Sequence, residues 1–292
     1  MGYVVSIVNM KGGVGKTTVT VNLATCLAKD FAKKVLVVDL DMQINATLSL
    51  LPPLYFTKLK KKKRTLRTLI NQIIQPNNQE HISTQEVIRP EICQIPGFDL
   101  LPGDIELYND FYLAAIIYSQ SQGNLKEFEL NWQKFENQLI KEIIKPVVDK
   151  YDFIFLDFPP GDHLLTRSGL LASELYLVPA KPEPLSVIGV GILEGRIQQL
   201  KKSDRTQINL IGILFNSRGH ATKMAPRIKK RLGAEFGEDK LFTTEIPVNV
   251  AIAQAVDEFK PVVLSNPQSS GAKAFSNLTK EFLKRVGAMG ES

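Results

Sequence analysis

A glycine-rich segment near the start of the chain constrains the fold more than any other feature. Residues 9–18 read Asn-Met-Lys-Gly-Gly-Val-Gly-Lys-Thr-Thr and stand between an apolar run, Tyr3 to Val8, and a segment with helical spacing of apolar residues. A strand, a glycine-rich loop and a helix in this order are the context of a phosphate-binding P-loop. A glycine-rich turn without a ligand is the alternative, and the Gly-Lys-Thr-Thr sequence that opens the helix argues against it.

The residue types in this loop indicate which ligand it binds. Glycines let the backbone turn tightly, so that successive N–H groups point inward at the positive end of a helix and form an anion site. Lys16 would place its ammonium against the β- and γ-phosphates of a nucleotide, and Thr17 would place its hydroxyl on Mg²⁺. The expected nucleotide-binding residues of the loop are Gly12, Gly13, Val14, Gly15, Lys16, Thr17 and Thr18.

Short apolar runs alternate with amphipathic helical patterns along the chain. This alternation predicts an α/β fold with a mostly parallel, twisted sheet flanked by helices. The expected strands are Tyr3 to Val8, Lys34 to Asp39, Phe98 to Leu101, Phe153 to Asp157, Leu175 to Val178, Ile208 to Phe215 and Phe242 to Glu245. The expected helices cover residues 17–29, 45–51, 66–75, 105–118, 128–149, 184–201, 225–233, 249–257 and 269–286. We expect one domain over residues 1–292, with excursions from the core near residues 52–66 and 75–97.

Composition argues against several classes of protein. The apolar fraction is 44%, and no uncharged apolar run reaches about 18 residues, so no membrane-spanning helix is expected. No secretion signal is expected either, because the amino end does not show a basic stretch followed by an apolar one. Cys26 and Cys93 are far apart and lack the spacing of metal ligands, which is ordinary in a reducing cytosol.

The net charge of +6 is unevenly distributed along the chain. Residues 58–67 contain seven Lys or Arg and no acid, and residues 196–234 contain ten Lys or Arg with Asp204 as the single acid. These segments hold 17 of the 36 basic residues, which leaves 19 basic against 29 acidic residues elsewhere. Basic patches on an otherwise acidic chain indicate a polyanionic partner such as nucleic acid. For residues 58–67, a solvated basic loop is the alternative.

The glycine-rich loop departs from the ordinary P-loop at two positions. The ordinary motif has a glycine five residues before Gly15, where this chain has Met10, and Lys11 is an additional lysine. The resulting Lys-Gly-Gly-x-Gly-Lys-Thr pattern resembles the deviant Walker A motif of the ParA/MinD family of ATPases. The resemblance implies that the nucleotide is ATP, and that Lys11 reaches across a dimer interface to the phosphates bound by the partner.

Further motifs extend the resemblance over nearly the whole chain. Residues 39–43, Asp-Leu-Asp-Met-Gln, resemble the family's second-strand Asp-x-Asp-x-Gln, with Met42 where the family has proline. Residues 153–161, Phe-Ile-Phe-Leu-Asp-Phe-Pro-Pro-Gly, resemble the strand-ending Asp-x-Pro-Pro of the family's second switch. The tripeptide Glu-Ile-Pro at 245–247 follows the family's closing pattern.

The resemblance also implies which residues carry the chemistry. Lys11, Lys16 and Asp41 would be the catalytic residues, and Asp41 would orient the attacking water in the first switch. Phosphoryl transfer asks mainly for positioning and charge neutralisation, which carboxylates beside a metal at strand ends can supply.

Metal and base contacts are implied in the same way. Asp39 and Asp157 would hold Mg²⁺ together with Thr17, and Asp157 would do so through a water. Asn216 would read the adenine edge, and Pro247 would pack beside the base. The alternative for each Asp taken alone is a helix cap or a turn, and Asn216 could equally be a turn residue.

The partition branch of the family implies a particular function. ATP binding would close a homodimer, the dimer would bind nucleoid DNA without sequence preference, and a ParB-like or other adaptor protein would stimulate ATP hydrolysis. The cargo would be a plasmid, a chromosome origin or a protein assembly such as a carboxysome, and the protein would be cytoplasmic and nucleoid-associated. The expected DNA-binding residues are Arg218, Lys223, Arg227, Lys230 and Arg231.

The main alternative is a MinD-like membrane-associated ATPase that acts in division-site placement. Such a protein needs a C-terminal amphipathic helix that is free to lie on lipid. One apolar stripe near the end of the chain has helical spacing, and we expect it to pack on the core instead, which argues against a membrane role. The stripe consists of Phe275, Leu278, Phe282 and Val286.

Two other members of the superfamily are excluded by missing residue types. An iron–sulphur electron carrier needs a cysteine near the second switch, and no cysteine follows Cys93. A tyrosine kinase of this superfamily needs a C-terminal tyrosine cluster, and the last tyrosine is Tyr176.

Overall fold

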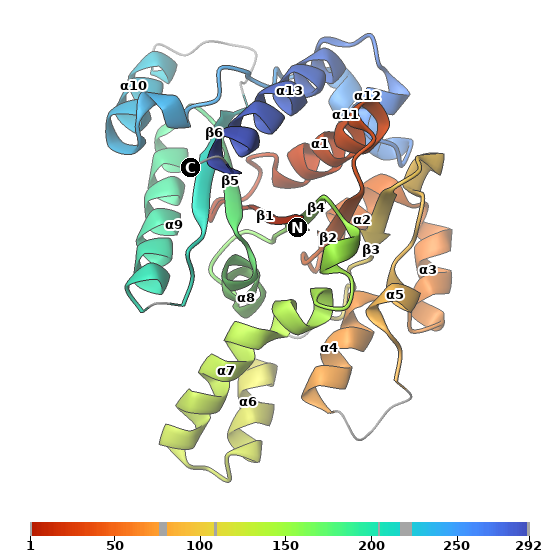
Figure 1. Ribbon diagram of the computed structural model, residues 1–292, viewed down its shortest axis with the longest axis vertical. Coiled ribbons are helices and arrows are strands. Elements are labelled where there is room, and N and C mark those ends of the chain that lie inside the picture. The colour runs from red at the N-terminus through yellow and green to blue at the C-terminus, as the bar shows by residue number, and fades with distance from the viewer. Residues whose placement is uncertain (1, 76–80, 108–109, 204, 217–223, 291–292) are drawn as a thin grey trace.

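Six parallel strands form the centre of the molecule (Figure 1). The structure is a computed structural model that describes residues 2–75, 81–107, 110–203, 205–216 and 224–290. The strands are β1 (Tyr3–Ile7), β2 (Val35–Asp39), β3 (Phe98–Leu101), β4 (Phe153–Asp157), β5 (Leu175–Ala180) and β6 (Asn209–Phe215). They pair in the order β3-β2-β4-β1-β5-β6, and each pairing is parallel. The predicted α/β fold with a mostly parallel sheet is therefore confirmed.

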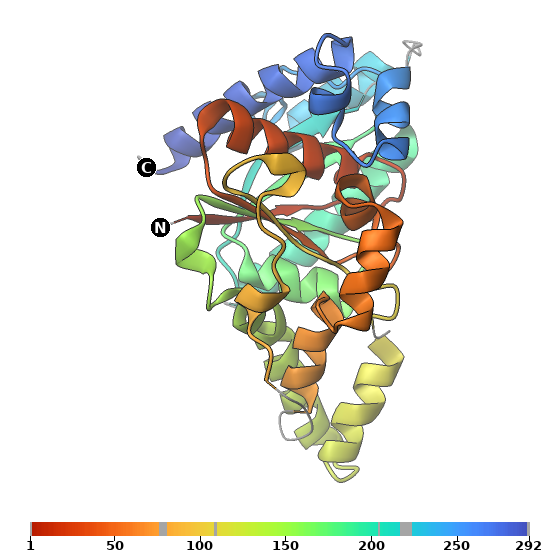
Figure 2. The same ribbon diagram turned by 90° about the vertical axis from the view of Figure 1, so that its right-hand side faces the viewer.

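Helices cover both faces of the sheet (Figure 2). Helices α1, α12 and α13 share one hydrophobic cluster with the sheet, and helices α4, α7, α8 and α9 share the other. The helices are α1 (Lys16–Phe31), α2 (Asn45–Leu50), α3 (Pro53–Lys61), α4 (Leu66–Ile74), α5 (Thr84–Val87), α6 (Asp110–Gln120), α7 (Leu125–Ile144), α8 (Leu164–Ala172), α9 (Pro184–Lys202), α10 (Ala225–Phe236), α11 (Val250–Asp257), α12 (Val262–Ser265) and α13 (Ser270–Gly290). Three short 3₁₀ turns lie at Ile92–Gln94, Val148–Lys150 and Glu238–Lys240.

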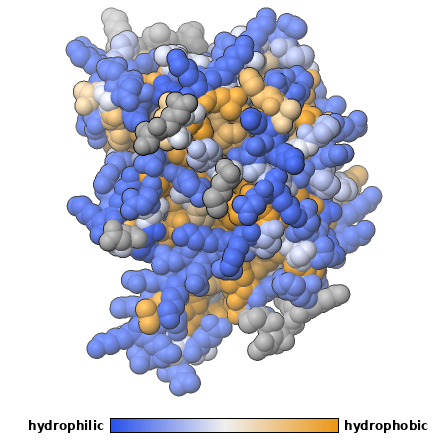
Figure 3. Space-filling view, in the orientation of Figure 1, coloured by the Kyte–Doolittle hydropathy of each residue, from blue (hydrophilic) through white to orange (hydrophobic). Residues whose placement is uncertain are grey.

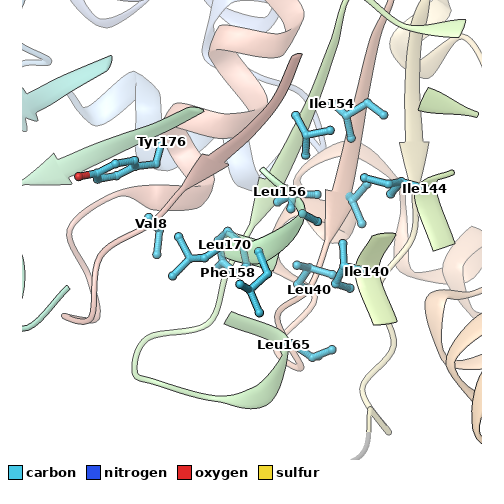
Figure 4. Close-up of a cluster of buried hydrophobic side chains, with 14 of the residues drawn as sticks. Val8, Leu40, Ile140, Ile144, Ile154, Leu156, Phe158, Leu165, Leu170 and Tyr176 are labelled. Carbon is cyan, nitrogen blue, oxygen red and sulfur yellow. The ribbon is translucent and has the colours of Figure 1, made fainter. Parts of the chain in front are cut away.

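The core is built around two central strands, β2 and β4. Every residue of β2 and β4 is buried, as expected for strands that are apolar up to a final aspartate and have helices on both faces. Side chains of β4 alternate between the two clusters, so that Ile154 and Leu156 meet α7 and α8 while Phe155 packs on the opposite face. Figure 4 shows part of the cluster that the sheet shares with α7, α8 and α9, in which Leu156, Phe158 and Leu170 lie close to one another.

The expected excursions from the core contain regular structure. Residues 52–66 hold α3, and residues 75–97 hold α5, with residues 76–80 outside the described part. A third excursion was not expected: α6 and α7 form a helical hairpin that extends away from the sheet (Figure 1). Figure 3 shows that hydrophilic residues cover most of one face of the molecule.

The strand expected at residues 242–245 is absent from the structure. This segment runs beside β6 and meets it only in isolated bridges at either end. Between the bridges, the N–H groups of Thr243 and Thr244 donate to the carboxylate of Glu281 in α13, at 2.8 and 2.9 Å. A side chain from a helix therefore satisfies the backbone donors that a strand ladder would have used.

Candidate nucleotide-binding site

The glycine-rich loop joins β1 to α1 at the carboxyl edge of the sheet, between the ends of β4 and β5. Gly13 and Gly15 have φ angles of +67° and +90°, which favour glycine over other residues. Gly15 stands at the N-cap of α1, and no side chain caps the helix there. The first N–H groups of α1 are therefore open to an anion, as the P-loop prediction requires.

Lys16 is buried beside this loop. Its ammonium donates to the carbonyl oxygens of Asn9 at 3.2 Å and of Lys11 at 3.1 Å, at the start of the loop. Burial lowers the pKa of Lys16, while the nearby charges of Asp157 and Asp41 act in the opposite direction. An anion bound in the loop would offset the cost of burying this charge.

Two hydroxyl groups of α1 meet the carboxylate at the end of β4. Thr17 donates to one oxygen of Asp157 at 2.7 Å, and Thr20 donates to the other at 3.0 Å. Burial raises the pKa of Asp157 to about 6, although these hydrogen bonds and the charge of Lys16 lower it. A hydroxyl and a carboxylate are hard oxygen ligands, and a divalent cation would favour the ionised carboxylate, so this pair fits Mg²⁺.

Asp39 lies at the end of the neighbouring strand, opposite Asp157 in the register of β2 and β4. One of its oxygens accepts from the N–H and the hydroxyl of Thr47 at 2.8 and 2.7 Å, and the other accepts from the N–H of Asp41 at 3.2 Å. Burial, followed by the charge of Asp157, raises its pKa to about 7. Asp39 therefore anchors α2 in this structure, and its role at a metal stays a prediction.

Asp41 faces the same region from the loop after β2. It is 5% exposed, and its carboxylate accepts from the N–H of Gln43 at 2.9 Å. Its charge acts on Lys16, so the two side chains lie in one electrostatic environment. The structure thus gathers the expected water-orienting carboxylate and the P-loop lysine at the same edge of the sheet.

Lys11, the additional lysine of the loop, is paired within its own chain. Its ammonium forms an ion pair with Glu183, just before α9, and the two side chains are 25% and 32% exposed. Gly189 of α9 makes this approach of helix and loop feasible, since a Cβ there would lie 2.8 Å from Asn9 Oδ1 and 3.2 Å from Lys11 Cβ. The ion pair therefore holds Lys11 within its own subunit.

Residues 159–161, which follow β4, touch the P-loop directly. The N–H of Gly161 donates to the carbonyl of Met10 at 3.0 Å, and a Cβ on Gly12 would lie 3.6 Å from Pro160. A movement of residues 159–161 would therefore change these contacts with the start of the P-loop.

A cavity of about 310 Å³ lies between the P-loop and the segment that leads into α11. Asn216 forms part of its wall and donates to the carbonyl of Val14, while its buried Oδ1 has no hydrogen-bond partner within the described residues. An orphaned acceptor of this kind suits the amino group of adenine. The lining residues are Gly13, Val14, Gly15, Thr18, Lys181, Asn216, Ile246, Pro247, Val248, Asn249, Ile252, Ala253 and Val256.

The expected DNA-binding residues are only partly described. Arg218 and Lys223 lie outside the described residues. Arg227, Lys230 and Arg231 are exposed on α10, and in the described part of the chain none of them pairs with an acidic side chain. The helix expected there is confirmed and extends to Phe236.

Two arginines of the basic stretch at 196–234 form ion pairs with acidic residues of the same chain. This corrects the view of that stretch as one open surface. Arg196 forms an ion pair with Asp162, directly after residues 159–161. Arg205 pairs with the buried Glu136 of α7 at 2.5 Å. The sequence alone does not show which basic residues of a stretch remain unpaired, because burial and ion pairing depend on distant elements.

The other basic run, at residues 58–67, divides in the same way. Lys60 and Arg67 pair with Glu106, and Arg64 pairs with Glu86 at 3.2 Å. The remaining four residues are exposed at the end of α3 and after it, and none is paired with an acid in the described part of the chain. They are Lys58, Lys61, Lys62 and Lys63.

Sequence reasoning missed three residues at this site, namely Thr20, Lys181 and Glu183. Thr20 stands one helical turn after Lys16, so the helical period could have indicated that it faces Asp157. Lys181 and Glu183 follow β5, and their position at the carboxyl edge of a parallel strand was the available signal.

Comparisons with known proteins agree with this arrangement. The family model of the AAA_31 type, described as an AAA domain, matches residues 2–210. The chain is 29% identical to the sporulation initiation inhibitor protein Soj of Bacillus subtilis over 96% of the chain and 98% of that protein. It is 30% identical to the chromosome-partitioning ATPase Soj of Thermus thermophilus over 97% of the chain and 96% of that protein. The crystal structure of the cell division ATPase MinD of Pyrococcus furiosus superposes with a TM-score of 0.66 at 28% identity, covering 97% of this chain and 99% of that one.

Proposed function

Because the chain belongs to the ParA/MinD superfamily of partition ATPases, we propose that it acts as an ATP-dependent dimerising switch that positions or segregates a cargo on DNA. Its activity is the hydrolysis of ATP, and its cofactors are ATP and Mg²⁺. The observation that carries the proposal is the gathering of Lys16, Asp41 and the Thr17–Asp157 pair around one P-loop.

The proposed chemistry follows from these positions. The N–H groups of the loop and Lys16 would bind and neutralise the phosphates, and Thr17 with Asp157 would hold the metal. When bound, Mg²⁺ supplies positive charge that stabilises the transferring phosphoryl group. Asp41 would orient the attacking water, and Asn216 with Pro247 would hold the base. Little covalent chemistry is asked of the protein, so positioning and charge decide the rate.

Dimerisation is proposed from the surface around Lys11. Three apolar residues on the exposed face of α9 have 56–63% of their surface open to solvent. They are Leu185, Ile188 and Ile192. They begin two residues after Glu183, the partner of Lys11. A second copy that covered this stripe would also bring its phosphates toward Lys11, which would then leave Glu183 for the stronger anion.

DNA binding is proposed for the exposed cations of α10. Arg227, Lys230 and Arg231 fall at i, i+3 and i+4 and therefore share one face of the helix. Contacts of this kind go to phosphates and carry no sequence information. A dimer would present two such faces, and ATP could then control DNA binding without touching DNA. An adaptor protein on the cargo, of the ParB type or another, would stimulate hydrolysis and release the dimer.

The membrane-associated alternative has less support in this structure. The stripe of α13 packs into the core, with Phe275, Leu278 and Phe282 fully buried and Val286 4% exposed. In the part of the chain that the structure describes, no helix is both long enough and apolar enough to span a bilayer.

Fluorescence anisotropy with two unrelated DNA duplexes, with and without ATP and Mg²⁺, tests the proposal. We expect binding to both duplexes with similar affinity, and only in the presence of ATP. Co-sedimentation with vesicles that contain anionic lipid is the companion measurement. A chain that ignores DNA and sediments with vesicles in the presence of ATP would refute the proposal in favour of a membrane switch.

A further inference from the structure

A small polar cavity lies where α3 meets α4, and it shares no lining residue with the cavity beside Asn216. Three basic residues and one acidic residue line it, namely Lys60, Lys63, Arg67 and Asp104. Its volume is about 180 Å³, below the roughly 300–1,000 Å³ of a site for a whole small molecule. A cavity of this size and charge suits a single anionic group.

One wall of this cavity is fixed to the end of β3. Asp104 is 1% exposed, and both of its carboxylate oxygens are engaged within the protein. One accepts from the hydroxyl of Thr65 at 2.6 Å, and the other accepts from the N–H of Glu106 at 2.9 Å. The N–H of Leu66 donates to the carbonyl of Pro102 at 2.8 Å, which ties the start of α4 to the same segment. The cavity walls are therefore preformed, and internal hydrogen bonds stabilise the charge of Asp104.

The first turns of α4 add hydrogen-bonding groups to the cavity. Because the hydroxyl of Thr65 is bonded to Asp104, no side chain caps this helix, and its positive end favours an anion. Thr68 and Asn71 lie one turn apart on the same helix face, and both line the cavity. The buried Oδ1 of Asn71 has no hydrogen-bond partner within the described residues, and a half-turn of the amide would place a donor there. The cavity thus combines cations with donors, which is what a phosphate group requires.

Glu106 holds two of the three basic residues. Its carboxylate pairs with Lys60 at 2.6 Å and with Arg67, and its side chain is 52% exposed. Ion pairs with this exposure contribute about 1 kcal/mol or less, so a phosphate that also meets the helix end can displace Glu106. Lys63 pairs with no acidic side chain in the part of the chain that the structure describes. The Glu106 carboxylate therefore stands where an exchangeable anion would bind.

We propose that this cavity binds one phosphate of the DNA backbone in exchange for the Glu106 carboxylate. The inference rests on the proposed function, in which the chain binds DNA. Three exposed lysines without acidic partners, Lys58, Lys61 and Lys62, extend the positive surface beyond the cavity, which favours a polyanion over an isolated phosphate. The cavity follows β3 and α10 lies beside β6, at opposite edges of the sheet, so this contact is distinct from the one proposed for α10.

DNA binding by Lys63→Gln tests the proposal, measured by fluorescence anisotropy with a non-hydrolysable ATP analogue and Mg²⁺. The affinity for two unrelated duplexes should fall about tenfold, because a charge-assisted phosphate contact is lost. The slope of log K against log salt should flatten by about 0.9 for each phosphate no longer neutralised. Lys62→Gln is the matched control: it removes the same charge from the next position, which is exposed and does not line the cavity. Its affinity should change by about twofold at most.

Glu106→Gln should have the opposite effect, because it removes the carboxylate that competes with the phosphate. The affinity for both duplexes should rise by about two- to fivefold. Glu86→Gln is the matched control, since Glu86 is 50% exposed and pairs with Arg64 of the same basic run, which does not line the cavity. Glutamine also preserves the capping box that Glu86 makes with Ser83. An equal gain from both variants would assign the effect to net charge and overturn the exchange.

The remaining outcomes separate this inference from the proposed function. If Lys63→Gln binds DNA like the parent, or weakens binding no more than Lys62→Gln, the cavity is not a DNA contact. Calorimetric titration with inorganic phosphate distinguishes the source of the phosphate: a site that Lys63→Gln loses for inorganic phosphate but not for DNA would belong to a free phosphate compound. A parent chain that ignores DNA refutes both proposals, whereas a parent that binds DNA through α10 alone refutes only this one. Thermal unfolding confirms that each variant is folded.

Discussion

The ammonium of Lys11 forms an ion pair with the carboxylate of Glu183, although 172 residues separate them in the chain. The pair joins the P-loop to the start of α9, and both side chains are partly exposed. Ion pairs with this exposure contribute about 1 kcal/mol or less to stability, so a stronger anion can displace Glu183. The pair therefore restrains the side chain of Lys11, and Lys11 can leave Glu183 when the phosphates of a second copy come close.

Glu183→Gln should make ATP-dependent dimerisation easier. The change removes the charge that competes with the partner's phosphates for Lys11, so the concentration of ATP analogue at half-maximal dimer should fall by about two- to fivefold. Light scattering across a series of analogue concentrations measures this midpoint. Lys11→Ala is the control and should stay monomeric, whereas a midpoint unchanged by Glu183→Gln would show that the ion pair does not restrain Lys11.

Lys16→Ala should abolish productive nucleotide binding. Lys16 is the buried cation within the loop, and its removal takes away the side-chain charge that would neutralise the β- and γ-phosphates from within the loop. The affinity for a non-hydrolysable ATP analogue, measured by isothermal titration, should fall by about one to two orders of magnitude. A mutant that folds and binds the analogue as tightly as the parent would invalidate the P-loop assignment.

Asp41→Ala should separate ATP binding from hydrolysis. In the proposed mechanism this carboxylate orients water, and it accepts a hydrogen bond from the N–H of Gln43, outside the loop that binds the phosphates. The mutant is expected to bind ATP and to accumulate as a dimer in light scattering, while phosphate release falls at least about a hundredfold. If it instead fails to dimerise with ATP, or hydrolyses ATP at the parent rate, the role given to Asp41 is wrong.

The fold and much of the site were accessible from sequence for identifiable reasons. The uncharged runs that open β2 and β4 are typical of central strands, and Asp39 and Asp157 follow them, so both carboxylates were expected at the carboxyl edge of the sheet beside the P-loop. Local patterns could not reveal that Thr243 and Thr244 would bond to Glu281 rather than to a strand. The same holds for the arm formed by α6 and α7, because a hairpin that leaves the core has the same amphipathic period as one that covers the sheet.

Interactions that join distant parts of the chain were the least accessible. Glu183 meets Lys11, and Arg196 meets Asp162, through tertiary packing that no spacing in the sequence encodes. Lys181 reaches the cavity for the same reason: it is close to Gly13 only because β1 and β5 are neighbours in the sheet.

Without nucleotide, the chain should become less stable as pH rises toward neutrality, and Asp157 should account for part of the decrease. Its pKa is raised from 3.8 to about 6, so between about pH 4 and pH 6 the folded state binds more protons than the unfolded state. The stability that protonated Asp157 provides is therefore present at low pH and is lost as pH rises through 6. Asp157→Asn should be more stable than the parent at pH 7.5 by at most about 3 kcal/mol, with the difference vanishing near pH 4.

Thermal unfolding of both chains across this pH range, without nucleotide, measures that difference. Asp39 titrates in both chains, so much of its contribution cancels in the comparison. Millimolar Mg²⁺ should narrow the gap at high pH, because the cation stabilises the ionised carboxylate of the parent. A stability difference that is independent of pH would show that Asp157 is ionised normally in the folded chain.

Charge reversal on α10 should weaken DNA binding without affecting the ATP-dependent dimer. Arg227→Glu with Lys230→Glu replaces two exposed cations on one helix face, and neither side chain pairs with an acid in the part of the chain that is described. Affinity for two unrelated duplexes should fall equally, because cations that meet phosphates are blind to sequence. The slope of log K against log salt should flatten by about 0.9 for each phosphate that the variant no longer neutralises, and a dimer carries each substitution twice.

The control must change the net charge by the same amount at a distant place. Lys126→Glu with Lys134→Glu on α7 does so, since both lysines are exposed on the hairpin arm. If the arm variant weakens DNA binding as much as the α10 variant, the effect belongs to net charge and the helix has no special role. If the α10 variant alone flattens the salt dependence while light scattering still shows an ATP-dependent dimer, α10 is the face that meets DNA, and dimerisation controls binding by doubling that face.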